Sequence, residues 1–194
     1  MGELLIRRRD MVLAGSPLPE WDYEWTMADG LLSENDFTIS KKGTGGTEAK
    51  VGNSYENMTG SSSNYNDYLY KDSSYLTGVI EADMYAPSSG NRLFLYFGNG
   101  SYGISVFFQG NSGIYINSSP TIKVADGPIN TRLVVKAVLK GTTADVYVNG
   151  TLVSADVDVT TFTHVSIIKV SARASGSNGK TTRLYGLRMK FNRI

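Results

Sequence analysis

The chain of 194 residues contains no cysteine and a single histidine, His164. Without cysteine there can be no disulfide, no thiol nucleophile and no Cys-ligated zinc or iron–sulfur site. One imidazole cannot build a multi-histidine metal site. Because His164 precedes an apolar run at 165–170, we interpret it as a strand-end residue rather than a base or a ligand. We therefore expect no metal and no cofactor.

Long apolar runs and an excess of charge are also missing. No run approaches the roughly 20 apolar residues that cross a bilayer. The first ten residues place three arginines after their apolar residues, the reverse of the order in an export signal. The 19 basic residues nearly balance the 18 acidic ones, for a net charge of +1. We therefore predict neither a nucleic-acid partner nor a membrane partner.

From Trp21 onward the chain consists of short β-branched and aromatic runs interrupted by Gly, Asn, Asp and Ser, which is typical of an all-β protein. Residues 78–85 alternate between apolar side chains and the acids Glu81 and Asp83, as expected of a half-buried strand. Asn149-Gly150 lies between two β-type runs, which predicts a type I′ hairpin. The more continuously apolar runs, expected to form the core, are 93–97, 104–108, 133–139 and 165–170.

This pattern predicts the fold class. About thirteen short strands joined by hairpins exceed what a simple open sheet holds, so we expect two antiparallel sheets packed face to face. Pro17 and Pro19 end any helix that residues 1–20 could form. The predicted organisation is therefore an N-terminal arm at residues 1–20 followed by an all-β, two-sheet antiparallel β-sandwich at residues 21–194.

The order of the strands and the hairpin Val146-Tyr147-Val148-Asn149-Gly150 resemble the concanavalin A-like lectin/glucanase superfamily, particularly its laminin-G-like and laminarinase-type members. The resemblance covers about residues 21–194 and implies a jelly roll that binds glycans, hydrolyses them or serves in adhesion. Glucanases of this fold resemble one another in a Glu-x-Asp-x-x-Glu strand, in which the acids act as nucleophile and general acid.

Here Glu81 and Asp83 match the first two acids of that strand, but Ala86 stands at the third position. The match also comes earlier in the chain than the catalytic strand of the family. We interpret both acids as a solvated strand face and predict no catalytic residues, so that the chain is expected not to be an enzyme.

Residues 41–74 are rich in Gly, Ser, Asn and Tyr, which predicts irregular strands and long loops. Tyrosine joins a flat apolar face to a hydroxyl and suits both sugar stacking and protein interfaces. An alternative is that these tyrosines only stabilise exposed strand positions. Asp67 and Asp72 offer oxygen ligands, but their spacing matches no EF-hand loop, so we favour a hydrated turn. The candidate ligand-binding residues are Tyr65, Tyr68, Tyr70 and Tyr75.

The arm combines apolar residues at helical spacing with a basic cluster. Its predicted docking residues are Leu4, Leu5, Arg7, Arg8, Arg9, Met11 and Val12. A cysteine-free, tyrosine-rich sandwich without an export signal resembles bacteriophage virion proteins, and the arm resembles attachment segments of phage head and tail decoration proteins.

The leading hypothesis is a non-enzymatic module on a virion surface, in head or tail decoration or in a fibre. It would be a homo-oligomer whose arm contacts other virion proteins or sister subunits, and whose sandwich binds host surface glycans. The alternative is a carbohydrate-binding or adhesion module of a bacterial surface protein, located at the cell surface or extracellularly. A third hypothesis is a glycan hydrolase with a rearranged acid pair.

Overall fold

The structure is a computed structural model that describes residues 21–35, 37–42, 47–58, 65–85, 91–98, 103–108, 114–117, 121–125, 131–159, 165–174 and 181–193. Within these ranges the chain forms β-strands, apart from turns and two short 3-10 helices, η1 (Met27–Asp29) and η2 (Leu32–Glu34). No helix in this part of the chain is long and apolar enough to cross a membrane.

All strand pairings among the described residues are antiparallel. The strands are β1 (Tyr23–Thr26), β2 (Thr38–Lys42), β3 (Thr47–Val51), β4 (Ser54–Met58), β5 (Tyr65–Tyr85), β6 (Asn91–Gly98), β7 (Gly103–Phe108), β8 (Ile114–Asn117), β9 (Thr121–Ala125), β10 (Arg132–Lys140), β11 (Thr143–Val148), β12 (Thr151–Asp158), β13 (Val165–Ala174) and β14 (Thr181–Arg193).

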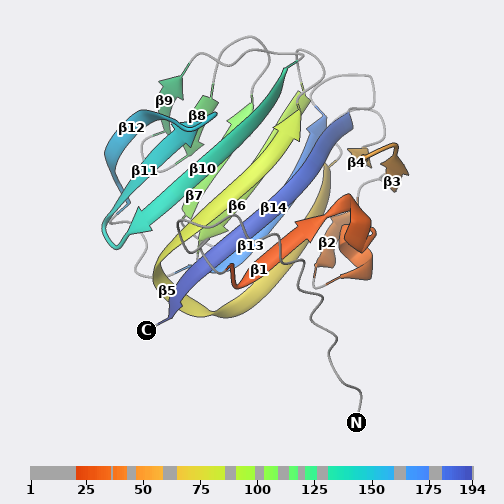
Figure 1. Ribbon diagram of the computed structural model, residues 1–194, viewed down its shortest axis with the longest axis horizontal. Helices are drawn as coiled ribbons and strands as arrows, with labels where there is room; N and C mark the ends of the chain where they lie inside the picture. Colours follow the sequence, from red (N-terminus) through yellow and green to blue (C-terminus); the bar gives the residue numbers. More distant parts are fainter. Residues whose placement is uncertain are drawn as a thin grey trace, which may run out of the picture.

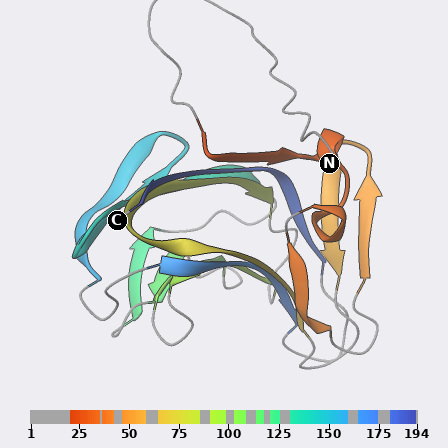
Figure 2. The ribbon, with the colours of Figure 1, turned by 90° about the horizontal axis from the view of Figure 1, so that it is seen from below.

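These strands form two layers, and the long strand β5 belongs to both. Residues 77–85 pair with β10 and β14, while residues 65–75 pair with β13. We call the layer β12-β11-β10-β5-β14-β1 the front sheet (Figure 1). The back sheet contains β2, the first part of β5, β13, β6, β7, β8 and β9. Figure 2 shows β5 turning from one layer into the other. The predicted all-β, two-sheet sandwich is confirmed.

The core lies behind the front sheet and follows the period-two pattern of its strands. Buried and half-buried residues alternate along β10, and Ile80, Ala82 and Met84 of β5 are buried while the acids between them are half-buried. Trp25 packs edge-on against Tyr55, with ring centroids 5.6 Å apart. These side chains exclude water from one face of the sheet, so the hydrophobic effect fixes which face points outward.

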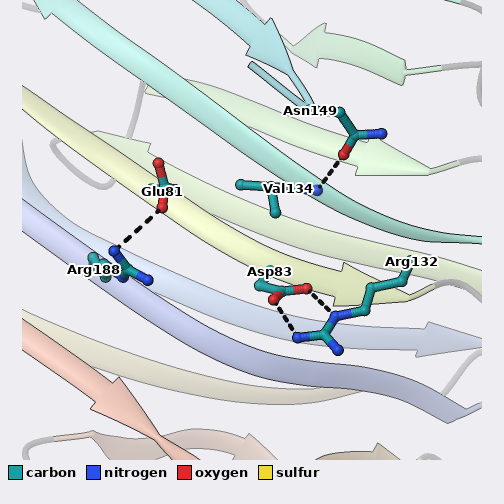
Figure 3. A network of polar contacts seen from close by, with 6 residues as sticks. All are labelled: Glu81, Asp83, Arg132, Val134, Asn149 and Arg188. Carbon is teal, nitrogen blue, oxygen red and sulfur yellow. Dashed lines mark hydrogen bonds and ion pairs between the residues drawn. The ribbon is translucent and has the colours of Figure 1, made fainter.

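The predicted Asn-Gly hairpin is confirmed. Asn149 and Gly150 have φ angles of 49° and 80°, which is the positive-φ pair that a type I′ turn needs. Asn149 also holds the neighbouring strand: its Oδ1 accepts a hydrogen bond of 2.9 Å from the Val134 N–H (Figure 3), and its N–H donates to the Val134 carbonyl at 2.8 Å. The turn is thereby attached to β10 as well as to its own two strands.

The prediction of long loops within residues 41–74 is wrong for residues 65–74, which belong to strand β5. Asp67 and Asp72 lie within the single strand β5 and not in a hydrated turn. The physical reason is that residues 65–75 gain main-chain partners in β13 and β2, and such pairing overrides the weak strand propensity of Asn, Asp and Ser. His164 and the whole arm lie outside the described residues, so the docking role of Leu4, Leu5, Arg7, Arg8, Arg9, Met11 and Val12 stays a prediction.

An ion-paired triad connects three strands at one end of the front sheet. The Lys140 ammonium lies 2.7 Å from Asp145 Oδ1 and 2.9 Å from Asp156 Oδ1. The Asp156 N–H donates to Asp145 Oδ1 at 3.0 Å. Hydrogen bonds to Asp145 first and to Asp156 second raise the pKa of Lys140 to about 12. The Lys140 hydrogen bond, helped by that backbone N–H, lowers the pKa of Asp145.

This triad predicts how stability depends on pH. Because the pKa of Asp145 falls below its ordinary value of about 3.9 on folding, its contribution is complete above that value and is lost as pH falls through the folded pKa. The contribution of Lys140 is complete below about 10.4 and is lost as pH rises through about 12. Asp145→Asn should therefore flatten the acid limb of a plot of Tm against pH, and Lys140→Met should flatten both limbs.

Asp156→Asn is the matched comparison, because Asn tolerates the positive φ of 50° at this position. The Asp156 side chain is 71% exposed, so this variant should change the acid limb less than Asp145→Asn does. An acid limb equally steep in wild type and in Asp145→Asn would contradict the assignment.

Candidate ligand-binding site

The outward side chains of the front sheet form rows across the strands, because paired residues in antiparallel neighbours lie about 5 Å apart. One row, which we call the charged row, joins Lys136 of β10, Glu81 of β5, Arg188 of β14 and Glu24 of β1. Its charges alternate in sign. The Arg188 guanidinium lies 3.3 Å from Glu24 Oε1. It also lies 3.9 Å from Glu81 Oε1 (Figure 3).

The next row, which we call the open row, contains little side-chain volume. It joins Val134, Asp83, Gly186 and Thr26. Gly186 contributes no side chain, and a Cβ built there would meet its nearest atom, the Trp25 carbonyl oxygen, at 3.7 Å, an ordinary van der Waals distance. The surface is therefore open at the position where β5, β14 and β1 lie side by side.

A bulge in β14 places an aromatic side chain beside this opening. Leu184 pairs with Met84 and Gly186 pairs with Asp83, so Tyr185 is an extra residue without a partner on β5. A bulge of this kind redirects the side chain it carries. Tyr185 consequently lines the opening together with residues of the open row.

Arg132 crosses from the next row to reach Asp83. Its Nε and Nη2 donate to the two carboxylate oxygens at 2.7 and 2.5 Å (Figure 3), the bidentate geometry that fixes both partners. The same guanidinium lies 4.0 Å from the centroid of the Tyr185 ring, within cation–π range. The hydrogen bond to Asp83 raises the pKa of Arg132, so this group remains charged.

Thr26 closes the opening on the β1 side. Its hydroxyl donates to Asp29 Oδ2 at 3.0 Å and accepts a hydrogen bond of 3.3 Å from the Ala28 N–H. The Ala28 contact caps η1, and the Thr26 N–H also donates to Asp29 Oδ2, at 2.7 Å, which is the reciprocal bond of the capping box. The 3-10 helix therefore fixes the position of this hydroxyl.

These groups enclose a hollow with a cavity volume of about 260 Å³. It presents carboxylate acceptors, guanidinium donors, a hydroxyl and a phenol, held mostly by one another. Its lining residues are Thr26, Glu81, Asp83, Arg132, Val134, Tyr185, Gly186 and Arg188. No group of three or more acidic or histidine side chains suited to a metal occurs in the part of the chain that the structure describes.

The backbones of the four predicted tyrosines lie in a different sheet from the strands that form the hollow. The backbones of Tyr65, Tyr68, Tyr70 and Tyr75 pair with β13 in the back sheet, whereas the hollow is built on β10, β5, β14 and β1 of the front sheet. The side chains of these tyrosines lie outside the described residues. Their ligand-binding role stays a prediction.

Glu81 and Asp83 lie on one outward strand face, as the sequence predicts. Their partners Arg132 and Arg188 and the nearby Tyr185 are not among the residues that the sequence predicts for a site. Residues 187–191 alternate between apolar and basic side chains, a pattern that places Arg188 away from the core. Nothing in the sequence pattern gave the register that sets Arg188 opposite Glu81, or the bulge at Tyr185.

No protein-family description and no curated protein matches this sequence, but solved structures share its fold. The laminarinase catalytic domain from Thermotoga maritima matches with a TM-score of 0.68 and 11% identity, over 90% of this chain and 99% of that domain. The Emp47p carbohydrate recognition domain matches with a TM-score of 0.66 and 10% identity, over 93% and 100%. A sialidase matches with a TM-score of 0.68 and 12% identity over 81% of this chain, which spans 17% of the sialidase.

At these identities the likeness shows the fold, which is a two-sheet β-sandwich of the jelly-roll type. It also corrects one expectation from the sequence. The matching laminarinase structure is a catalytic domain, and an alginate lyase and a transglycosylase also share the fold. The prediction that the chain is not an enzyme is therefore wrong as an inference, because one incomplete acid motif does not exclude catalysis in a fold that enzymes use.

The ion pairs of the hollow should contribute little to stability. The Arg132 side chain is 57% exposed, and exposed pairs contribute about 0–1 kcal/mol. Asp83→Asn should lower the free energy of unfolding by less than about 1 kcal/mol, whereas Met84→Ala in the same strand should lower it by about 2–5 kcal/mol. Urea denaturation measures both. A loss above about 3 kcal/mol in Asp83→Asn would mean that the pair holds the fold together and does not merely shape the hollow.

Proposed function

We propose that the protein binds a glycan chain and that the hollow holds one sugar residue of that chain. The observation that carries this proposal is an open position at Gly186 surrounded by polar groups held in place by one another. Its volume of about 260 Å³ lies just below the range of about 300–1,000 Å³ typical of pockets for larger ligands. A single sugar ring is a ligand of suitable size.

The chemistry of the lining suits hydroxyl groups, each of which donates and accepts hydrogen bonds. Asp83 and Glu81 supply acceptors, and Arg132 and Arg188 supply donors. Because each charged group is already held by a partner, little side-chain freedom is lost when a ligand binds. Tyr185 adds an aromatic surface and a hydroxyl, the combination that binding surfaces favour.

The fold supports a glycan as the class of ligand. The matching structures include a carbohydrate recognition domain, a laminarinase and a transglycosylase solved in complex with NAG. Their names concern carbohydrates although their sequences are only 10–11% identical to this chain. A role on carbohydrate is thus common to proteins that share little sequence with this one.

Gly186→Val tests the proposal by filling the hollow. A Cβ at this position fits the backbone, and valine favours strands, so the fold should persist while the Kd for an oligosaccharide rises at least about tenfold, equivalent to about 1.4 kcal/mol. Isothermal titration calorimetry against gluco-, manno- and galacto-oligosaccharides measures binding. Assay of new reducing ends in the same mixtures reports whether a bound chain is cut.

The control for this variant is Leu152→Ser. Leu152 lies on β12 of the same sheet, is 48% exposed and does not line the hollow. It should bind as the wild type does. Glycan binding that persists unchanged in Gly186→Val would place the binding surface elsewhere on the molecule.

We further propose, from the sequence, that residues 1–20 attach this module to sister subunits and to a larger particle, with a virion surface as the first candidate and a bacterial surface as the alternative. Support comes from the apolar and basic residues of this segment. Deleting residues 1–20 should abolish a homo-oligomer while the sandwich stays folded, as measured by light scattering and circular dichroism. An unchanged molar mass per particle after correction for the deletion would contradict the docking role.

A further inference from the structure

Both cations that line the hollow already have carboxylate partners. Arg132 uses Nε and Nη2 on the two oxygens of Asp83. Arg188 lies between Glu24 and Glu81. An anion that entered the hollow would find the Nε and Nη2 edge of Arg132 occupied by Asp83, and it would have to share the charge of both guanidinium groups with these carboxylates.

The hollow also lacks an excess of positive charge that would attract an anion in spite of these carboxylates. The two arginines face three carboxylates, those of Asp83, Glu81 and Glu24. The next cation along the charged row, Lys136, has its ammonium 4.3 Å from the centroid of the Tyr147 ring on β11. Counting it brings the local formal charge only to zero, so the hollow carries no excess of positive charge.

A ligand carboxylate would therefore be repelled by the carboxylates of the hollow. If Arg132 turned to pair with the ligand, Asp83 would lose its own partner. Both effects oppose binding. An uncharged sugar meets neither cost, since its hydroxyls can accept from the remaining guanidinium N–H groups and donate to carboxylate oxygens without separating the pairs.

Resting on the glycan-binding function proposed above, we propose that the hollow selects an uncharged sugar residue over one that carries a carboxylate, such as a uronate or a sialate. The selectivity comes from the carboxylates that hold the arginines. The same ion pairs that position the donors thus exclude acidic sugars.

The test uses matched ligands: gluco-, manno- and galacto-oligosaccharides, each beside the same compound oxidised to a carboxylate at C6. Calorimetry at low and at moderate NaCl should show the neutral member of a bound pair binding at least tenfold more tightly. Its Kd should change less than twofold with salt, because no net charge is matched on binding. A carboxylated member that binds as tightly or more tightly, and loses affinity with salt, would overturn the selectivity.

Glu81→Gln probes the cause. It replaces a carboxylate of the hollow by an amide of the same shape and should lower the ratio of the two Kd values at least threefold. Asp156→Asn, which removes a carboxylate that does not line the hollow, is the matched control and should leave the ratio unchanged. Equal ratios in wild type and Glu81→Gln would contradict the electrostatic cause. Absence of binding by every pair would contradict the proposed glycan function itself.

Discussion

The main-chain pairing of β5 is the constraint on which the rest of the structure depends. Residues 77–85 have hydrogen-bonded partners on both sides, β10 and β14, and the first part of the same strand continues into the back sheet. A strand paired on both sides cannot slip by one residue without exchanging its two faces. Burial of Ile80, Ala82 and Met84 therefore fixes Glu81 and Asp83 on the outside.

The hollow depends on this constraint and on two local features of β14. The bulge adds Tyr185, and Gly186 leaves the neighbouring position empty. The arginines of the ion pairs around the opening are exposed, with side-chain exposures of 57% for Arg132 and 47% for Arg188, while Asp83 and Glu81 are half-buried. With one partner in solvent, these pairs position groups more than they stabilise the fold. Burial of the core side chains keeps the strands in register. The side chains of the outer face are not needed for this and are available for binding a ligand.

Strand faces and turns depend on neighbouring residues and can be predicted from the sequence. Contacts between strands depend on which strands pair and in which register, and the sequence does not give them. Period-two alternation was sufficient for the two faces of residues 78–85, and Asn149-Gly150 was sufficient for the hairpin. The pair of Arg132 and Asp83 joins residues 49 positions apart, and no local pattern encodes such a partner. The tyrosine-rich segment has an unusual composition and is therefore predicted to bind a ligand. The hollow instead consists of residues of common types that strand pairing brings together from four strands. The inference against catalysis failed because it rested on one motif, while the fold is one that several enzymes share.

Native-state amide hydrogen exchange along β5 tests the central constraint most directly. If residues 79–84 pair on both sides as described, their amides should all exchange slowly and with similar protection, close to that of global unfolding. Exchange that is fast at every second amide, as in a strand with one free edge, would contradict the pairing and with it the assignment of the outer face.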